Sequence, residues 1–221
     1  MQIGRRSFLG AAATLATLPT VAIAAERKAG ASKFPKGFLW GAATAGHQIE
    51  GNNVNSDSWV METIKPTLFR EPSLDAANSL ELWPADLDLV KSLGLNTYRF
   101  SIEWSRIEPL QGDFSTAMLN HYKAVIEGCR RRGLIPMVTF NHFTTPKWFA
   151  GLGGWTNPKS PELFARFCER ATRHLGAQIG LATTLNEPNL KDKFSSEDKT
   201  LVEESTAEAL RWLESNAETA D

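Results

Sequence analysis

The chain has 221 residues, of which 42% are hydrophobic, and its formal net charge is -1 at pH 7. This composition is typical of a folded globular protein, and the balanced charge does not favour nucleic acid or an anionic membrane as a partner. The two cysteines, Cys129 and Cys168, have no Cys or His at metal-ligand spacing. They are predicted to be buried thiols, and a disulfide between them is the alternative.

The first residues have the features of an export signal. Paired arginines (Arg5 and Arg6) precede a weakly apolar run that ends in an A-x-A site at Ala24. This pattern predicts a twin-arginine signal peptide over residues 1–24, and therefore a periplasmic or secreted protein. A membrane anchor is the disfavoured alternative. The apolar run is broken by Pro19 and is shorter than the roughly 20 residues that a membrane span needs.

Strand and helix patterns alternate after a polar linker over residues 25–33. Apolar, β-branched or aromatic runs predict four strands, at residues 38–45, 96–104, 135–143 and 181–187. Apolar residues at helical spacing predict three long helices, at residues 80–94, 115–133 and 160–176. Ser160 is the expected N-cap of the third helix, with Pro161 in its first turn. Strands that alternate with helices predict a parallel α/β sheet.

Each predicted strand runs into polar or aromatic residues. In a (β/α) barrel the carboxyl ends of the strands form the rim of the active site, so this placement favours catalysis. A doubly wound sheet is the alternative, but no Gly-rich phosphate loop follows the first strand. A complete barrel has eight βα units in about 250 residues. The predicted fold is therefore α/β, a partial (β/α)8 TIM barrel of the first four βα units over residues 34–190, followed by a C-terminal helical tail over 191–221.

Four motifs accompany the four predicted strands. They are FLWGAATAGHQIEG (38–51), YRFSIEWSRIEP (98–109), NHFTTPKWF (141–149) and TLNEPN (184–189). In this order and spacing they resemble the N-terminal half of a family 1 glycoside hydrolase, the β-glucosidase and β-galactosidase family. The resemblance implies retaining hydrolysis of small-molecule β-glycosides, without a metal or a cofactor.

The resemblance also implies roles for five residues. Glu187 matches the general acid/base, which protonates the leaving oxygen and then accepts a proton from water. Asn186 matches the residue that binds the sugar 2-hydroxyl, and Gln48 and His142 match residues that bind other sugar hydroxyls. Arg99 matches the arginine that lies against the nucleophile and keeps it ionised.

Other residues near the strand ends are assigned less directly. Trp148 and Phe143 are expected to offer apolar faces to the sugar ring. Glu50 and Glu103 are also near strand ends, and a structural pairing of either one with Arg99 is favoured over a catalytic role.

The second carboxylate of the reaction has no counterpart in the sequence. A retaining mechanism needs two carboxyl groups about 5–5.5 Å apart. In the family the nucleophile is a glutamate in a TENG-like motif after the seventh strand, and no such motif occurs here. We therefore expect a truncated enzyme that is inactive or nearly so on its own. The alternatives are a non-catalytic sugar-binding fragment, or a chimeric product with a partner-binding helix.

Two further expectations concern the ends of the half-barrel. Residues 191–221 have the pattern of an amphipathic helix, and they resemble the lid helices of the seventy-kilodalton heat-shock chaperones. The outer strands of a half-barrel would be open edges, which predicts self-association through those edges.

Overall fold

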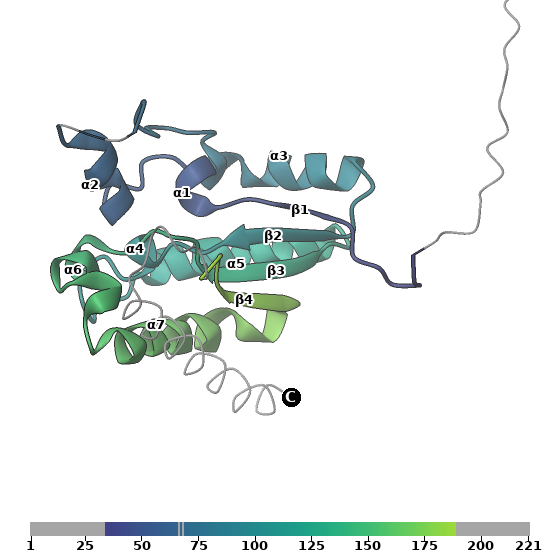
Figure 1. Cartoon of the computed structure of the whole chain (residues 1–221). Helices are drawn as coiled ribbons and strands as arrows, with labels where there is room; N and C mark the ends of the chain where they lie inside the picture. Colours follow the sequence, from purple (N-terminus) through teal and green to yellow (C-terminus); the bar gives the residue numbers. More distant parts are fainter. Residues whose placement is uncertain (1–33, 66, 68, 189–221) are drawn as a thin grey trace, which may run out of the picture. The chain divides into compact units, whose positions relative to one another are not determined.

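The computed structural model describes residues 34–65, 67 and 69–188 (Figure 1). The signal peptide and linker predicted over 1–33, and the helical tail predicted over 191–221, lie outside the described residues. The chain divides into two units, Met1–Phe38 and Leu39–Asp221, and the second contains every element described below.

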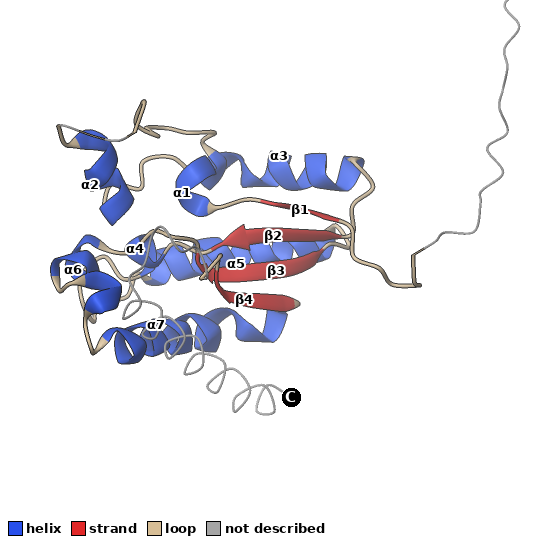
Figure 2. Ribbon diagram, viewed as in Figure 1, coloured by secondary structure: helices blue, strands red, loops and turns tan. Residues whose placement is uncertain are grey.

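Four parallel strands form a single sheet in the order β1-β2-β3-β4 (Figure 2). The strands are β1 (Gly41–Ala43), β2 (Thr97–Ser101), β3 (Ile135–Asn141) and β4 (Leu181–Leu185). Each is shorter than the run that predicted it. All four strands end two or three residues earlier than predicted, and β1 also begins three residues later. The parallel α/β fold and the four strands are confirmed.

Helices connect the strands. The three long ones lie where the apolar periodicity predicts them: α3 (Ser79–Ser92), α5 (Thr116–Arg131) and α7 (Ser160–Leu175). The short ones are α1 (Gly46–Ile49), α2 (Asp57–Thr63), α4 (Trp104–Ile107), α6 (Lys147–Gly151), η1 (Gly154–Thr156) and η2 (Gly176–Gln178). The turns α1, α4 and α6 follow β1, β2 and β3, so they determine how the chain leaves the sheet at the strand ends.

The starts of α5 and α7 differ in how they are capped. α5 begins after Ser115, whose hydroxyl accepts a hydrogen bond from the Met118 N–H at 3.2 Å. The predicted cap of α7 is wrong. Ser160 is the first residue of that helix and Lys159 is the N-cap. Ser160 is drawn inward instead, because its hydroxyl donates to the Trp155 carbonyl at 3.2 Å.

The core lies between the helices and one face of the sheet. Alternate residues of β2 (Tyr98 and Phe100) and of β3 (Val138 and Phe140) are buried there, as the two-residue period of a strand requires. Trp104 is at the centre of an aromatic cluster. Its ring centroid is 4.7–5.6 Å from those of three phenylalanines, Phe149, Phe164 and Phe167.

The helix layer contains two buried thiols and one close contact between helices. Cys129 and Cys168 are buried and free, so the buried-thiol prediction is confirmed and the disulfide alternative is wrong. Burial raises the pKa of Cys129 to about 12. α3 and α5 approach closely at Gly128, where a Cβ would lie 2.5 Å from Trp83 Cζ3.

The other face of the sheet is partly open within the described residues. Ile135 of β3 is 39% exposed and Leu181 of β4 is 40% exposed. Within the described part of the chain, β1 and β4 each have a neighbouring strand on one side only. None of the helices described there is long and apolar enough to cross a membrane.

Candidate active site

The residues predicted to bind sugar follow or end the parallel strands. Arg99 is in β2, His142 directly follows β3, and Asn186 and Glu187 directly follow β4. Gln48 is in α1, the turn after β1. Because all four strands are parallel, their carboxyl ends meet at one edge of the sheet, where ligands bind in α/β proteins.

Arg99 joins three strands at this edge. Its Nη2 donates to Asn186 Oδ1 at 2.8 Å, and its Nε donates to Thr139 Oγ1 of β3 at 2.8 Å. The Asn186 N–H in turn donates to the Asn141 carbonyl at 2.9 Å. The guanidinium therefore fixes the orientation of the Asn186 amide, with its oxygen toward Arg99 and its NH2 group left to donate elsewhere.

The expected pairing of Glu50 or Glu103 with Arg99 is wrong. Glu50 accepts hydrogen bonds from the Tyr122 hydroxyl at 3.0 Å and from Arg106 Nε at 2.9 Å. Glu103 lies beyond the end of β2 as the N-cap of α4, and its side chain is directed toward α1. The guanidinium of Arg99 reaches the other way, toward β3 and β4.

Glu187 and Phe143 adopt left-handed backbone conformations two residues after their strands end. Their φ angles are +51° and +72°. A non-glycine residue in this region costs of order 1–3 kcal/mol, and such residues gather at functional sites. Glu187 is exposed, so its carboxyl group is accessible to a ligand.

Gln48 and His142, the other two predicted sugar ligands, differ in how exposed they are. Gln48 is exposed on α1. His142 is half-buried, and its ring is edge-on to that of Phe143, with a centroid separation of 5.0 Å. A direct hydrogen bond joins Arg99 to Asn186, whereas Gln48, His142 and Glu187 share only their position at the carboxyl-end edge of the sheet.

Trp148 differs from expectation because its indole packs into the core. Its Nε1 donates to the Glu108 carbonyl at 2.9 Å, and its ring is edge-on to Trp104 at 5.7 Å. The Arg166 guanidinium lies 5.9 Å from the centre of the same ring. Trp148 therefore supports α4 and α7 instead of offering a sugar-ring face.

A buried polar network beneath this edge was not predicted. His47 Nε2 and Glu62 Oε1 are 2.6 Å apart, and the other oxygen of Glu62 accepts from the Ser73 N–H and hydroxyl. Burial acts to raise the pKa of Glu62, but the hydrogen bonds from Ser73 and His47 outweigh it and lower that pKa overall. The sequence gives little sign of this pairing, because His47 is in α1 and Glu62 is in α2, 15 residues away.

Glu50 is a buried carboxyl group with a strongly raised pKa. Burial, followed by the negative charge of Glu103, raises the pKa of Glu50 to about 7. Arg106 and the Tyr122 hydroxyl act in the opposite direction and are outweighed.

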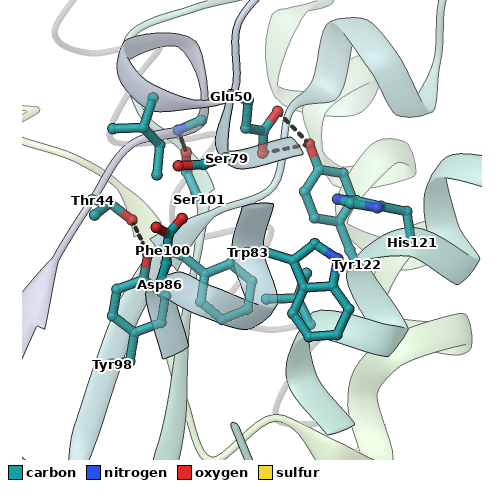
Figure 3. A pocket seen from close by; sticks show the side chains of 13 residues that line it. Thr44, Glu50, Ser79, Trp83, Asp86, Tyr98, Phe100, Ser101, His121 and Tyr122 are labelled. Carbon is teal, nitrogen blue, oxygen red and sulfur yellow. Dashed lines mark hydrogen bonds between the residues drawn. The ribbon is translucent and has the colours of Figure 1, made fainter. Parts of the chain in front are cut away.

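A cavity of about 30 Å³ lies beside Glu50 (Figure 3). Its walls include the hydrogen-bonded pair Thr44 and Tyr98, whose oxygens are 2.7 Å apart, and the Tyr122 hydroxyl. This volume has room for one or two water molecules and not for a sugar ring. None of the five predicted sugar-site residues lines it. Among the described residues, no group of three or more His, Cys, Asp or Glu side chains is placed to hold a metal ion.

Successive βα units with polar side chains at the carboxyl ends of parallel strands are the arrangement of part of an α/β barrel. The comparisons with known proteins give the particular family. Residues 30–198 match the family model described as Glycosyl hydrolase family 1. The chain belongs to glycosyl hydrolase family 1.

Curated relatives carry β-glucosidase names. The chain is 36% identical over 176 residues to "Probable inactive beta-glucosidase 14" of Oryza sativa subsp. japonica, covering 76% of this chain and 34% of that protein. It is 33% identical over 163 residues to "Beta-glucosidase A" of Thermotoga maritima, covering 71% of this chain and 36% of the relative. The chain therefore spans about a third of the length of these two relatives.

Solved structures agree on the fold. The crystal structure of beta-glycosidase BGL167 superimposes with a TM-score of 0.77 and 40% identity, covering 82% of this chain and 53% of that one. The β-glucosidase of Thermotoga maritima, in complex with a substituted glucoimidazole, gives a TM-score of 0.76 at 26% identity, covering 82% and 47%. The partial barrel is thus shared with whole β-glycosidases.

Proposed function

We propose that this chain supplies the acid/base half of a β-glucosidase-type active site. In this proposal Gln48, His142 and Asn186 bind the sugar of a small β-glycoside, and Glu187 protonates the glycosidic oxygen. The observation that carries the proposal is the Arg99–Asn186 hydrogen bond at 2.8 Å, which ties the end of β4 to β2 immediately before Glu187. Family membership supplies the reaction class.

Each residue has a chemical task that fits its surroundings. The Asn186 oxygen accepts from Arg99, so its NH2 group is free to donate to a sugar hydroxyl. Glu187 is exposed next to it, where its carboxyl can donate a proton to the leaving oxygen and then remove one from water. Contacts to the sugar hydroxyl strengthen as oxocarbenium character develops in the transition state.

The nucleophile is the missing part of the reaction. A retaining glycosidase needs a second carboxyl about 5–5.5 Å from the acid/base. Arg99, which in the family lies against that nucleophile, donates here to an amide oxygen and a threonine hydroxyl. No described carboxylate forms an ion pair with it. We propose that the chain lacks the nucleophile, is truncated, and does not turn over β-glucosides alone.

Glucose-like ligands of the solved relatives support the substrate class. The β-glucosidase of Thermotoga maritima was solved with castanospermine and with cyclophellitol, both compounds of monosaccharide size. A non-catalytic sugar-binding fragment is the second candidate function. The absence of a described carboxylate beside Arg99 favours it.

Two further proposals concern location and assembly. The twin-arginine pattern over residues 1–24 supports export to the periplasm or beyond the cell. The open sides of β1 and β4 support self-association of the half-barrel.

The deciding experiment measures turnover and binding separately. Release of nitrophenol from 4-nitrophenyl β-D-glucoside is compared for the chain and for Glu187→Gln, and castanospermine binding is measured by calorimetry. We expect nitrophenol release to be equal in both proteins, because no glycosyl-enzyme can form. We expect saturable castanospermine binding that Gln48→Ala weakens.

Three outcomes decide between the possibilities. Turnover above that of Glu187→Gln contradicts the missing nucleophile and makes the chain a complete glycosidase. Binding without turnover supports a sugar site without its nucleophile, which both the acid/base half-site and the non-catalytic sugar-binding fragment predict. A folded chain that neither binds castanospermine nor releases nitrophenol contradicts a sugar site on this chain.

A further inference from the structure

Glu103 is a buried carboxylate with four neutral donors around it. Its side chain is at the N-terminus of α4, and the residue is 1% exposed. Oε2 accepts from Asn53 Nδ2 and from the Thr144 hydroxyl, each at 2.7 Å. Oε1 accepts from the His47 N–H at 3.2 Å and lies 3.4 Å from the Ser101 hydroxyl. Within the described part of the chain, Glu103 forms no ion pair.

Two of the four donors, the His47 N–H and the Thr144 hydroxyl, come from the segments that carry proposed sugar ligands. His47 directly precedes Gln48 in α1. Thr144 is two residues after His142, in the chain that leaves β3, and its N–H donates to the His142 carbonyl at 2.9 Å. One oxygen of the carboxylate therefore holds α1, and the other holds the segment after β3.

The α1 turn also packs directly on this carboxylate. A Cβ at Gly46 would lie 2.6 Å from Glu103 Cγ and 2.7 Å from its Oε1, so the contact requires glycine. The Gly46 N–H donates to the Ser101 hydroxyl at 2.7 Å, which fixes the turn to the end of β2. The contacts of Gly46 with Glu103 and Ser101 thereby set the position of Gln48, two residues further along α1.

We propose that Glu103 is a positioning residue of the sugar site: its carboxylate sets the spacing between Gln48 on α1 and His142 after β3. The inference rests on the proposed function, since it assigns Gln48 and His142 to the sugar. Glu103 touches no substrate in this scheme and acts through the two segments that it joins.

Glu108 provides a matched comparison. It is also fully buried and also accepts several hydrogen bonds, from Trp104 Nε1 and the Gly112 N–H at 2.7 Å each, and from Arg166. These donors belong to α4, the loop after it and α7. A buried carboxylate that is merely structural should therefore behave like Glu108, whose carboxylate accepts no hydrogen bond from the α1 turn or from residues 142–145.

The test replaces each carboxylate by its isosteric amide. In Glu103→Gln one oxygen becomes an NH2 group, so either the His47 side or the Thr144 side loses its acceptor. We expect hydrogen exchange of the backbone amides at 46–49 or at 142–145 to rise about tenfold. Glu108→Gln should raise exchange in α4 and at Gly112 and leave both of those segments unchanged.

Ligand affinity is the second measurement. Castanospermine should bind about tenfold more weakly to Glu103→Gln than to the unmodified chain, and Glu108→Gln should bind it as the unmodified chain does. Thr144→Val completes a double-mutant cycle. If the carboxylate acts through Thr144, part of the Glu103→Gln effect on affinity disappears in the Thr144→Val background.

The outcomes separate this inference from the proposed function. Unchanged exchange in both segments of Glu103→Gln overturns the inference, and so does raised exchange with unchanged affinity. Equal loss of affinity in Glu103→Gln and Glu108→Gln also overturns it, because that pattern reports general destabilisation. If the unmodified chain binds no castanospermine, the proposed function fails, whereas localised exchange in Glu103→Gln still supports the link between the two segments.

Discussion

Arg99 shows how one side chain can organise several strands. Its two donor groups reach Thr139 on β3 and Asn186 after β4, 40 and 87 residues away in the sequence. The planar guanidinium makes both bonds at once because its N–H groups point in fixed, diverging directions. The cost of ordering a long side chain is thus offset by two contacts that both serve the site.

Replacing Arg99 by lysine tests that geometry. Lysine keeps the charge but presents a single ammonium, which cannot reach both partners in the fork arrangement. We expect castanospermine to bind Arg99→Lys roughly tenfold more weakly, because the Asn186 amide loses its fixed orientation. The measurement is calorimetry, with Thr139→Val as the control that removes only the Nε partner. Equal affinity in Arg99→Lys and the unmodified chain would show that Asn186 needs no orienting group.

Glu50 predicts a pH dependence of stability. Burial raises its pKa from 4.5 to about 7 in the folded chain. Between these two pH values the folded state therefore holds a proton that the unfolded state has released. The stabilising contribution is complete below about pH 4.5 and is lost as the pH rises through about 7. A shift of this size corresponds to about 3 kcal/mol.

The check is urea unfolding at pH 5 and pH 8. The unmodified chain should lose more unfolding free energy between these two pH values than Glu50→Gln does, since the variant has no proton to release there. Replacement of the exposed Glu71 by glutamine serves as the control. A Glu50→Gln protein with the full pH dependence would assign that dependence to another group.

At the residue scale, the sequence predicts which side chains reach the site and not which partners they have. Gln48, Arg99, His142, Asn186 and Glu187 follow from motifs placed at strand ends. The partner of Arg99 does not follow, because its hydrogen bonds connect positions far apart in the chain. The buried carboxylates are equally hidden, since their donors lie in turns that have no periodic pattern.

At the scale of elements, the packing of α3 against α5 depends on Gly128. Alanine is the better helix former by about 1 kcal/mol, so propensity alone predicts that Gly128→Ala stabilises the protein. The structure predicts the opposite sign, because the added Cβ would lie 2.5 Å from the Trp83 ring. Overpacking of this kind costs about 1–3 kcal/mol.

Urea unfolding of Gly128→Ala should therefore show a loss of unfolding free energy. Gly151→Ala, in α6, is the matched control, because a Cβ there meets no atom within 4 Å. That variant should leave stability unchanged or raise it by up to about 1 kcal/mol, the helix propensity difference alone. A stabilised Gly128→Ala would mean that α3 shifts away at little cost.

The long helices could be predicted and the short ones could not, for a physical reason. α5 and α7 each have 16 residues, so their apolar stripes repeat over four turns. α1 and α4 have only four residues each, too few to show a period. The same limit explains why the strand predicted over 96–104 extends into α4, because a four-residue helix has no period that would mark its start at Trp104.

At the scale of the whole molecule, the described sheet has four of the eight strands of a barrel. Its open face and its end strands leave apolar side chains in contact with water, including Ile135 and Leu181. Such edges favour pairing with another chain. The alternation of strands and helices was enough to predict the parallel sheet, because parallel neighbours require a crossover between them.

Self-association can be measured by sedimentation. We expect the unmodified chain to sediment above the mass of a monomer, and Leu181→Lys to shift it toward the monomer by placing a charge on β4. Leu152→Lys is the control, since Leu152 is 46% exposed at the end of α6 and away from the sheet. A monodisperse monomer of the unmodified chain would contradict the prediction.

The order of the strands has a consequence for how the molecule is made. Each strand of the sheet pairs with the one that precedes it in the chain, from β1 through β4. A ribosome therefore releases every βα unit next to a partner that is already present, and the body can grow by addition at one edge during translation. The most recently made strand always has one unpaired edge. A nascent chain is thus most prone to mispair at that strand, until the next strand pairs with it and becomes the unpaired edge in turn.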